Sequence, residues 1–185
     1  MPVVTVRPRR PEDIPVLTEV LWEQQPTSRY PFRNPLPIPI VRFLHVDDAL
    51  GAWTAEVDGR PVGHAVSTGA PRGFPGAEEM NEACALAHGC EVRDLAWVSS
   101  LFVSLDCRRL GIGRRLLGVV VADMQSSGLH PCLEMLAVHP AAAALYESSG
   151  WRTVMQTRPG WLLDAGPDVP DVQVMVLPSA SAVVE

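Results

Sequence analysis

Residues 108–117, with the sequence RRLGIGRRLL, place two glycines among two pairs of arginines. If a helix begins here, the backbone N–H groups of its first turn have no intrahelical partners, and the helix dipole adds partial positive charge. Gly111 and Gly113 lack a Cβ atom, so a ligand can approach the backbone closely. Further charged donors come from Arg108, Arg109 and Arg114. The combination suits a phosphate or pyrophosphate, although a tight turn with solvated arginines would use the same residue types.

Two common phosphate-binding motifs do not fit this segment. A dinucleotide fingerprint would need glycine where Leu116 stands, and a P-loop would need a lysine. All fifteen basic residues of the chain are arginine, so Schiff-base chemistry and a lysine general base are excluded as well.

Composition indicates one globular domain. The chain has 185 residues, of which 47% are hydrophobic and 19% charged. We expect a single domain over residues 1–178 and a flexible tail over 179–185. The net charge of −6 argues against nucleic-acid binding. No apolar run approaches the roughly 18–20 residues of a membrane helix, and the N-terminus lacks a signal layout, which predicts a cytoplasmic protein without a membrane segment.

Hydrophobic periodicity predicts a mixed α/β fold. In this fold the glycine-containing segment 108–114, which we call the glycine corner, lies between a strand and a helix. An Asp58-Gly59 turn signal predicts a hairpin between residues 53–57 and 61–67. The first helix is expected to follow Pro11 and stop before Pro26. The other expected strands are 3–8, 95–104, 132–138, 151–157 and 172–177. The other expected helices are 41–50, 78–87, 111–127 and 140–150.

Two segments together resemble the GNAT N-acetyltransferase family. LFVSLDCRRLGIGRRLL (101–117) resembles the family's acetyl-CoA-binding motif, and HPAAAALYESSGW (139–151) resembles its second signature. The first pattern is matched by Leu101, Val103, Arg108, Gly111 and Gly113. The second is matched by Ala142, Leu145, Tyr146, Glu147 and Gly150, with Trp151 as the aromatic residue. His139 departs from the family pattern, which often has Asn there.

The resemblance implies the GNAT acyl-CoA N-acyltransferase fold, an α/β fold with a six- to seven-stranded mixed sheet flanked by about four helices. It also implies acetyl-CoA as co-substrate, held in a V-shaped opening between the fourth and fifth strands. Backbone groups of the fourth strand would pair with pantetheine, and N–H groups of the corner would bind the pyrophosphate. The residues implied in binding are Leu101, Phe102, Val103, Arg108, Arg109, Leu110, Gly111, Ile112, Gly113, Arg114, His139, Ala142 and Tyr146.

Transfer of an acetyl group to an amine needs a proton acceptor for the amine and a proton donor for the departing thiolate. By the resemblance, the Val103 N–H would polarise the thioester and Tyr146 would be the general acid. Glu134 on the fifth strand is the predicted general base. Glu91, Asp94 and His64 remain alternatives for that role.

No metal is expected, because the spacing of Cys84, His88 and Cys90 matches no common zinc pattern. Segments 22–50 and 70–94 and the Trp161 loop are expected to select the acceptor, and their insertions favour a small-molecule amine. The alternatives are acetylation of a protein N-terminus or lysine, and a non-catalytic acyl-CoA-binding domain. Pairing of strand edges into a homodimer is common in the family.

Overall fold

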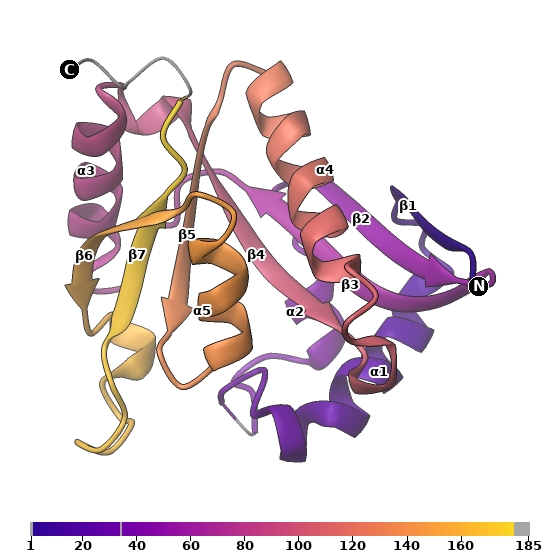
Figure 1. Cartoon of the computed structure of the whole chain (residues 1–185). Helices are drawn as coiled ribbons and strands as arrows, with labels where there is room; N and C mark the ends of the chain where they lie inside the picture. Colours follow the sequence, from indigo (N-terminus) through magenta and orange to yellow (C-terminus); the bar gives the residue numbers. More distant parts are fainter. Residues whose placement is uncertain (1, 34, 180–185) are drawn as a thin grey trace. The chain divides into compact units, whose positions relative to one another are not determined.

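The computed structural model of this chain describes residues 2–33 and 35–179, so the predicted tail lies outside the described residues apart from residue 179. The chain forms two compact units: Met1–Thr68 with Val98–Asp123, and Gly69–Trp97 with Met124–Glu185. Seven strands follow the order β1-β2-β3-β4-β5-β7-β6 in one sheet within the described ranges. The long strand β4 (Leu95–Val103) and the helix α4 (Ile112–Ser126), both labelled in Figure 1, each have residues assigned to both units.

The first unit contains an antiparallel meander of β1 (Val4–Pro8), β2 (Ala49–Val57) and β3 (Arg60–Thr68). Asp58 and Gly59 close the β2–β3 hairpin with φ of 50° and 81°. Positive φ at both turn residues matches the twist of the two strands, so the predicted hairpin is confirmed. The helix expected over 41–50 is shorter, because β2 begins at Ala49, which pairs with Thr68 in the sheet.

Helix α1 (Asp13–Ser28) packs against β3 and α2 (Ile40–Leu44). The prediction that this helix stops before Pro26 is wrong: Pro26 lies inside its last turn. A proline there forfeits a single helical hydrogen bond, and the helix continues to Ser28, where it is capped by Arg29 with a φ of 54°. The buried apolar cluster of this region is made by Ile14, Leu17, Val20, Leu21, Leu44 and Phe102.

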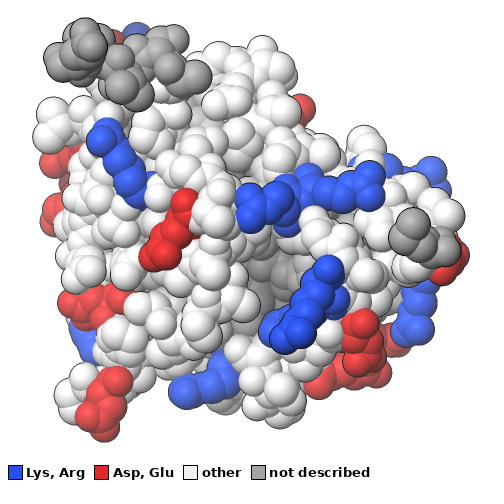
Figure 2. All heavy atoms as spheres, in the orientation of Figure 1, with Lys and Arg blue, Asp and Glu red and all other residues white. Residues whose placement is uncertain are grey.

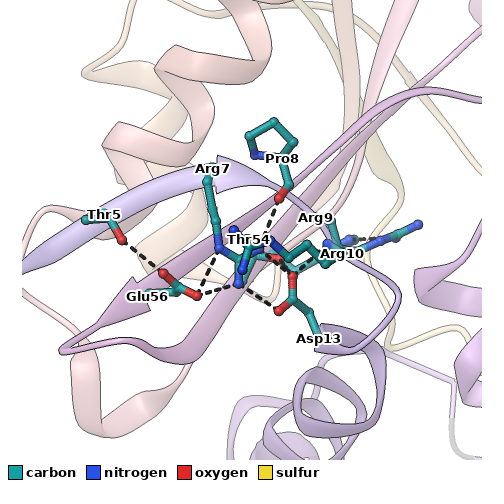
Figure 3. A network of polar contacts seen from close by, with 9 residues as sticks. Thr5, Arg7, Pro8, Arg9, Arg10, Asp13, Thr54 and Glu56 are labelled. Carbon is teal, nitrogen blue, oxygen red and sulfur yellow. Dashed lines mark hydrogen bonds and ion pairs between the residues drawn. The ribbon is translucent and has the colours of Figure 1, made fainter.

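A network of charged side chains joins the start of α1 to β1 and β2 (Figure 3). Arg7 donates two hydrogen bonds to Asp13, of 2.7 and 2.8 Å, and also bonds Glu56. Asp13 further accepts from the Thr54 hydroxyl at 2.9 Å and from the Arg10 N–H at 2.8 Å. The Arg7 guanidinium holds the pKa of the Asp13 carboxyl well below its usual range. Asp13 is buried, so its charge depends on these partners.

The second unit contains β5 (His130–Leu136), β7 (Val172–Val176) and β6 (Arg152–Thr157), with β7 pairing antiparallel to both neighbours. Helix α3 (Ala77–His88) packs on β6 and β7. Its side chains Met80 and Cys84 are fully buried in a cluster with Leu95, Trp97, Cys132, Val174 and Val176. The segment expected to be a substrate-selecting insertion therefore supplies part of the core.

The remaining elements are α5 (Pro140–Glu147) and three short 3-10 helices, η1 (Val92–Asp94), η2 (Leu105–Cys107) and η3 (Gly160–Leu162). Across the described part of the chain, no helix has both the length and the apolar character needed to cross a membrane.

Candidate functional site

The glycine corner lies in the first unit, between η2 and α4. Gly111 has a φ of 73°, in the left-handed region that favours glycine, and Arg109, two residues before it, has a φ of 65°. The first hydrogen bond of α4 runs from the Arg115 N–H to the Gly111 carbonyl at 3.1 Å. The N–H groups of the preceding residues, Ile112 to Arg114, therefore stand at the open end of the helix, where an anion is favoured.

Some side chains around this corner are buried in the protein, whereas others are exposed and positively charged. Ile112 is buried and fixes the first turn of α4. Arg108, Arg109 and Arg114 are exposed, as is Leu110. Where Figure 1 draws the start of α4, the coloured side chains of Figure 2 are mostly basic. Arg115 donates to the Val4 carbonyl at 2.9 Å and so joins α4 to β1.

The end of β4 is held tightly against β3. Phe102 is buried among the side chains of α1 and α2, whereas Leu101 and Val103 are half-buried. Just beyond the strand, the Ser104 N–H donates to the Val62 carbonyl at 2.7 Å. A Cβ atom at Gly63 would lie 2.9 Å from the Phe102 carbonyl oxygen, so the absence of a side chain there permits the close approach of the two strands.

Glu134 lies on β5 in the second unit, opposite Val174 of β7. Burial raises the pKa of its carboxyl to about 7, although the Trp161 indole N–H, 3.4 Å from its Oε2, acts in the opposite direction. A carboxylate with this pKa takes up a proton near neutral pH, as a general base must. Sequence reasoning named both residues but did not pair them, because Trp161 is 27 residues away in the chain.

Tyr146 lies on α5 in the same unit and is buried. Its ring meets that of Trp151 edge to face, with 6.1 Å between the centroids. Burial raises the pKa of the phenol to about 12, so it keeps its proton at neutral pH and can donate it. His139 precedes this helix, and its carbonyl accepts from the Ala142 N–H at 3.0 Å, which sets the start of α5.

The three alternative bases are placed less favourably than Glu134. His64 is fully buried, with Nδ1 3.1 Å from the Ser100 carbonyl and Nε2 3.0 Å from Arg9. Glu91 and Asp94 instead cap η1 at the surface, and Glu91 pairs with Arg93 at 3.1 Å. Both ring nitrogens of His64 are thus engaged, and the Glu91 and Asp94 carboxylates are committed to capping η1.

The predicted site residues thus form two groups. Leu101–Val103 and the corner 108–114 belong to the first unit, whereas Glu134, His139, Ala142 and Tyr146 belong to the second. Among residues 2–33 and 35–179, no three His, Cys, Asp or Glu side chains are grouped so that they could hold a metal ion.

Comparison with known proteins identifies the family. The model of the acetyltransferase (GNAT) family matches residues 15–151 of this chain. The chain belongs to this family. The resemblance inferred from the two motifs is therefore confirmed, and the family to which the chain belongs is one of acetyltransferases that use acetyl-CoA.

Solved structures confirm the predicted GNAT fold. A Salmonella typhimurium protein solved with its cofactor acetyl-CoA has a TM-score of 0.69 at 18% identity, covering 98% of this chain and 96% of that one. The ribosomal-protein-alanine N-acetyltransferase of Brucella melitensis has a TM-score of 0.67 at 20% identity, covering 93% and 98%.

A curated relative of this GNAT chain is the Xenopus laevis protein named "Probable N-acetyltransferase camello". The two are 29% identical over 113 residues, which are 60% of this chain and 43% of that protein. The matched region thus covers less than half the length of that relative.

Proposed function

We propose that this GNAT protein transfers the acetyl group of acetyl-CoA to the primary amine of a small molecule. The observation that carries the proposal is that burial raises the pKa of two groups in the second unit, the half-buried Glu134 and the buried Tyr146. The Glu134 carboxyl has a pKa of about 7 and the Tyr146 phenol a pKa of about 12. Near neutral pH the carboxyl can therefore accept a proton while the phenol keeps its own, as a base and an acid in catalysis must.

Acetyl-CoA would be held by the first unit. The N–H groups at the start of α4 and the exposed arginines suit its pyrophosphate, because an anion there interacts with the helix end and with charged donors together. Backbone groups of Leu101, Phe102 and Val103 would bind pantetheine, with the Val103 N–H directed at the thioester oxygen. These residues have the chemistry that the co-substrate requires.

The proton transfers would belong to the second unit. Glu134 would take a proton from the acceptor ammonium, which leaves a neutral amine able to attack the thioester carbon. The carbon–nitrogen bond forms, the carbon–sulfur bond breaks, and the Tyr146 hydroxyl would protonate the departing sulfur. The nitrogen then carries one proton too many for an amide, and that proton would pass to the Tyr146 phenolate and restore the phenol. Both groups are in the required state near neutral pH, since the phenol is protonated and the carboxyl is close to its midpoint.

A protein N-terminal amine is the second candidate acceptor. It is favoured by the likeness to the Brucella melitensis ribosomal-protein-alanine N-acetyltransferase over nearly the whole length of both chains. A half-buried carboxylate beside an indole, as at Glu134 and Trp161, suits the amino group of either acceptor.

The deciding experiment measures thiol release from acetyl-CoA by the full chain over a panel of small primary amines, peptides with free N-termini, and N-terminally blocked lysine peptides. Mass spectrometry identifies each acetylated product. We expect turnover with one or more small amines. Turnover confined to peptides would replace the small-molecule proposal. Thermal stabilisation by acetyl-CoA with no turnover on any acceptor would instead indicate a non-catalytic binding domain.

A further inference from the structure

Ser100 interrupts β4 with a backbone conformation that strands do not normally contain. Its φ is 50°, in the left-handed region, and the residue is 4% exposed. A non-glycine residue keeps such a conformation only where its surroundings hold it. Ser100 directly precedes Leu101–Val103, so the direction of its peptide determines how the main chain of those three residues is presented.

Two hydrogen bonds hold Ser100 in place. Its hydroxyl donates to the Phe43 carbonyl at 2.9 Å, and its carbonyl lies 3.1 Å from His64 Nδ1. Since a carbonyl only accepts, Nδ1 must carry the proton. The other nitrogen of His64, Nε2, is then the acceptor for Arg9, whose Nη1 lies 3.0 Å away. Burial lowers the pKa of His64 to about 4, which keeps the ring in this neutral form.

Arg9 extends the same contacts to the end of α2. Its Nη1 also donates to the Leu44 carbonyl, and its Nη2 lies 3.2 Å from His45 Nδ1. Arg9 stands two residues after Arg7, on the stretch of chain drawn in Figure 3, but it bonds different partners. The contacts therefore form a closed ring: α2 to Arg9, Arg9 to His64, His64 to Ser100, and Ser100 back to Phe43 of α2.

We propose that His64 and Arg9 are positioning residues for the acyl donor: they hold the left-handed Ser100 peptide and thereby fix the main chain of Leu101–Val103 that receives acetyl-CoA. The inference rests on the donor site proposed above. His64 acts through its Nδ1–H bond to Ser100, and Arg9 acts by holding the ring in the orientation and tautomer that make this bond.

The test uses three variants of His64 in the full chain and acetyl-CoA as the probe. Asn places an amide N–H near the position of Nδ1, Gln extends its amide toward Nε2, and Leu has no polar atom. Calorimetric titration gives the Kd for acetyl-CoA, steady-state kinetics give KM for acetyl-CoA and kcat, and urea unfolding gives stability. Ser67→Ala is the matched control, because Ser67 is also buried on β3 but bonds the Gly51 carbonyl.

We expect His64→Gln and His64→Leu to raise the Kd and KM for acetyl-CoA about tenfold or more, the effect of losing one buried hydrogen bond. His64→Asn should restore most of the affinity, and Ser67→Ala should bind as the unmodified protein does. Arg9→Gln carries the same test if the His64 variants do not fold, because Arg9 is partly exposed.

Equal affinities of the Asn and Gln variants, or a loss of stability with an unchanged Kd, would overturn the positioning role. For Arg9→Gln, an unchanged Kd has the same meaning. Failure of the unmodified protein to bind acetyl-CoA would refute the proposed function itself. If the unmodified protein binds acetyl-CoA and the variants have the same Kd, only the positioning role is refuted.

Discussion

Replacement of Glu134 by Gln is expected to lower activity and at the same time raise stability. Burial raises the pKa of the folded carboxyl from 4.5 to about 7. The folded protein therefore binds this proton more tightly than the unfolded chain does. The resulting stability is complete below about pH 4.5 and is lost as the pH rises through about 7. Gln keeps the shape of the side chain and an oxygen for the Trp161 N–H but cannot ionise.

The size of the effect follows from the pKa. One pH unit of separation corresponds to about 1.4 kcal/mol, so ionising Glu134 in the folded protein costs about 3 kcal/mol above pH 7. The free energy of unfolding of Glu134→Gln, relative to the unmodified protein, should therefore rise by about 3 kcal/mol between about pH 4.5 and about pH 8. Over the same range the variant should lose the acidic limb, near pH 7, from its pH profile of kcat/KM.

Urea unfolding at a series of pH values measures the first quantity and thiol release from acetyl-CoA the second. Glu82→Gln serves as the control, because Glu82 is an exposed carboxyl on α3 of the same unit. Subtracting the unmodified protein at each pH removes the titration of all other groups. A stability difference that stays constant across this range would refute the reasoning about burial. An acidic limb that survives in Glu134→Gln would refute the role of Glu134 as base.

Three further changes have defined outcomes. Tyr146→Phe should lower kcat by roughly a hundredfold while the Kd for acetyl-CoA stays the same, and an unchanged kcat would exclude the phenol as acid. Gly63→Ala would bring a Cβ atom to 2.9 Å from the Phe102 carbonyl, so it should weaken acetyl-CoA binding in calorimetry about tenfold or more, and normal binding would show that β3 can yield. Asp13→Asn removes one of the two carboxylates that pair with Arg7, with Glu56 as the other, and should cost about 3 kcal/mol in urea unfolding at neutral pH. Because the Asp13 pKa is lowered, this difference should shrink as the pH falls below about 4, and a difference that persists in acid would contradict it.

Local signals were sufficient for much of the fold. The Asp58-Gly59 turn was predictable because its two residue types adopt positive φ readily, and Gly111 because a left-handed corner before a helix favours glycine. The end of α1 was not predictable from Pro26, since a proline in the last turn forfeits only one helical hydrogen bond and the helix can continue past it. The role of α3 in the core was also missed, because its short apolar pattern does not reveal which strands it covers.

The sequence by itself determined the family and the position of the donor motif, because a phosphate corner needs glycines and basic residues at fixed spacing along one short stretch of chain. Only the tertiary structure distinguished Glu134 from the other candidates for the general base. Glu134, Glu91, Asp94 and His64 are all titratable residue types, and what distinguishes them is burial and hydrogen bonding from residues distant in the chain. Trp161 reaches Glu134 across 27 residues, and Arg9 reaches His64 across 55. A pKa is a property of such an environment, so it emerges only when the chain has folded.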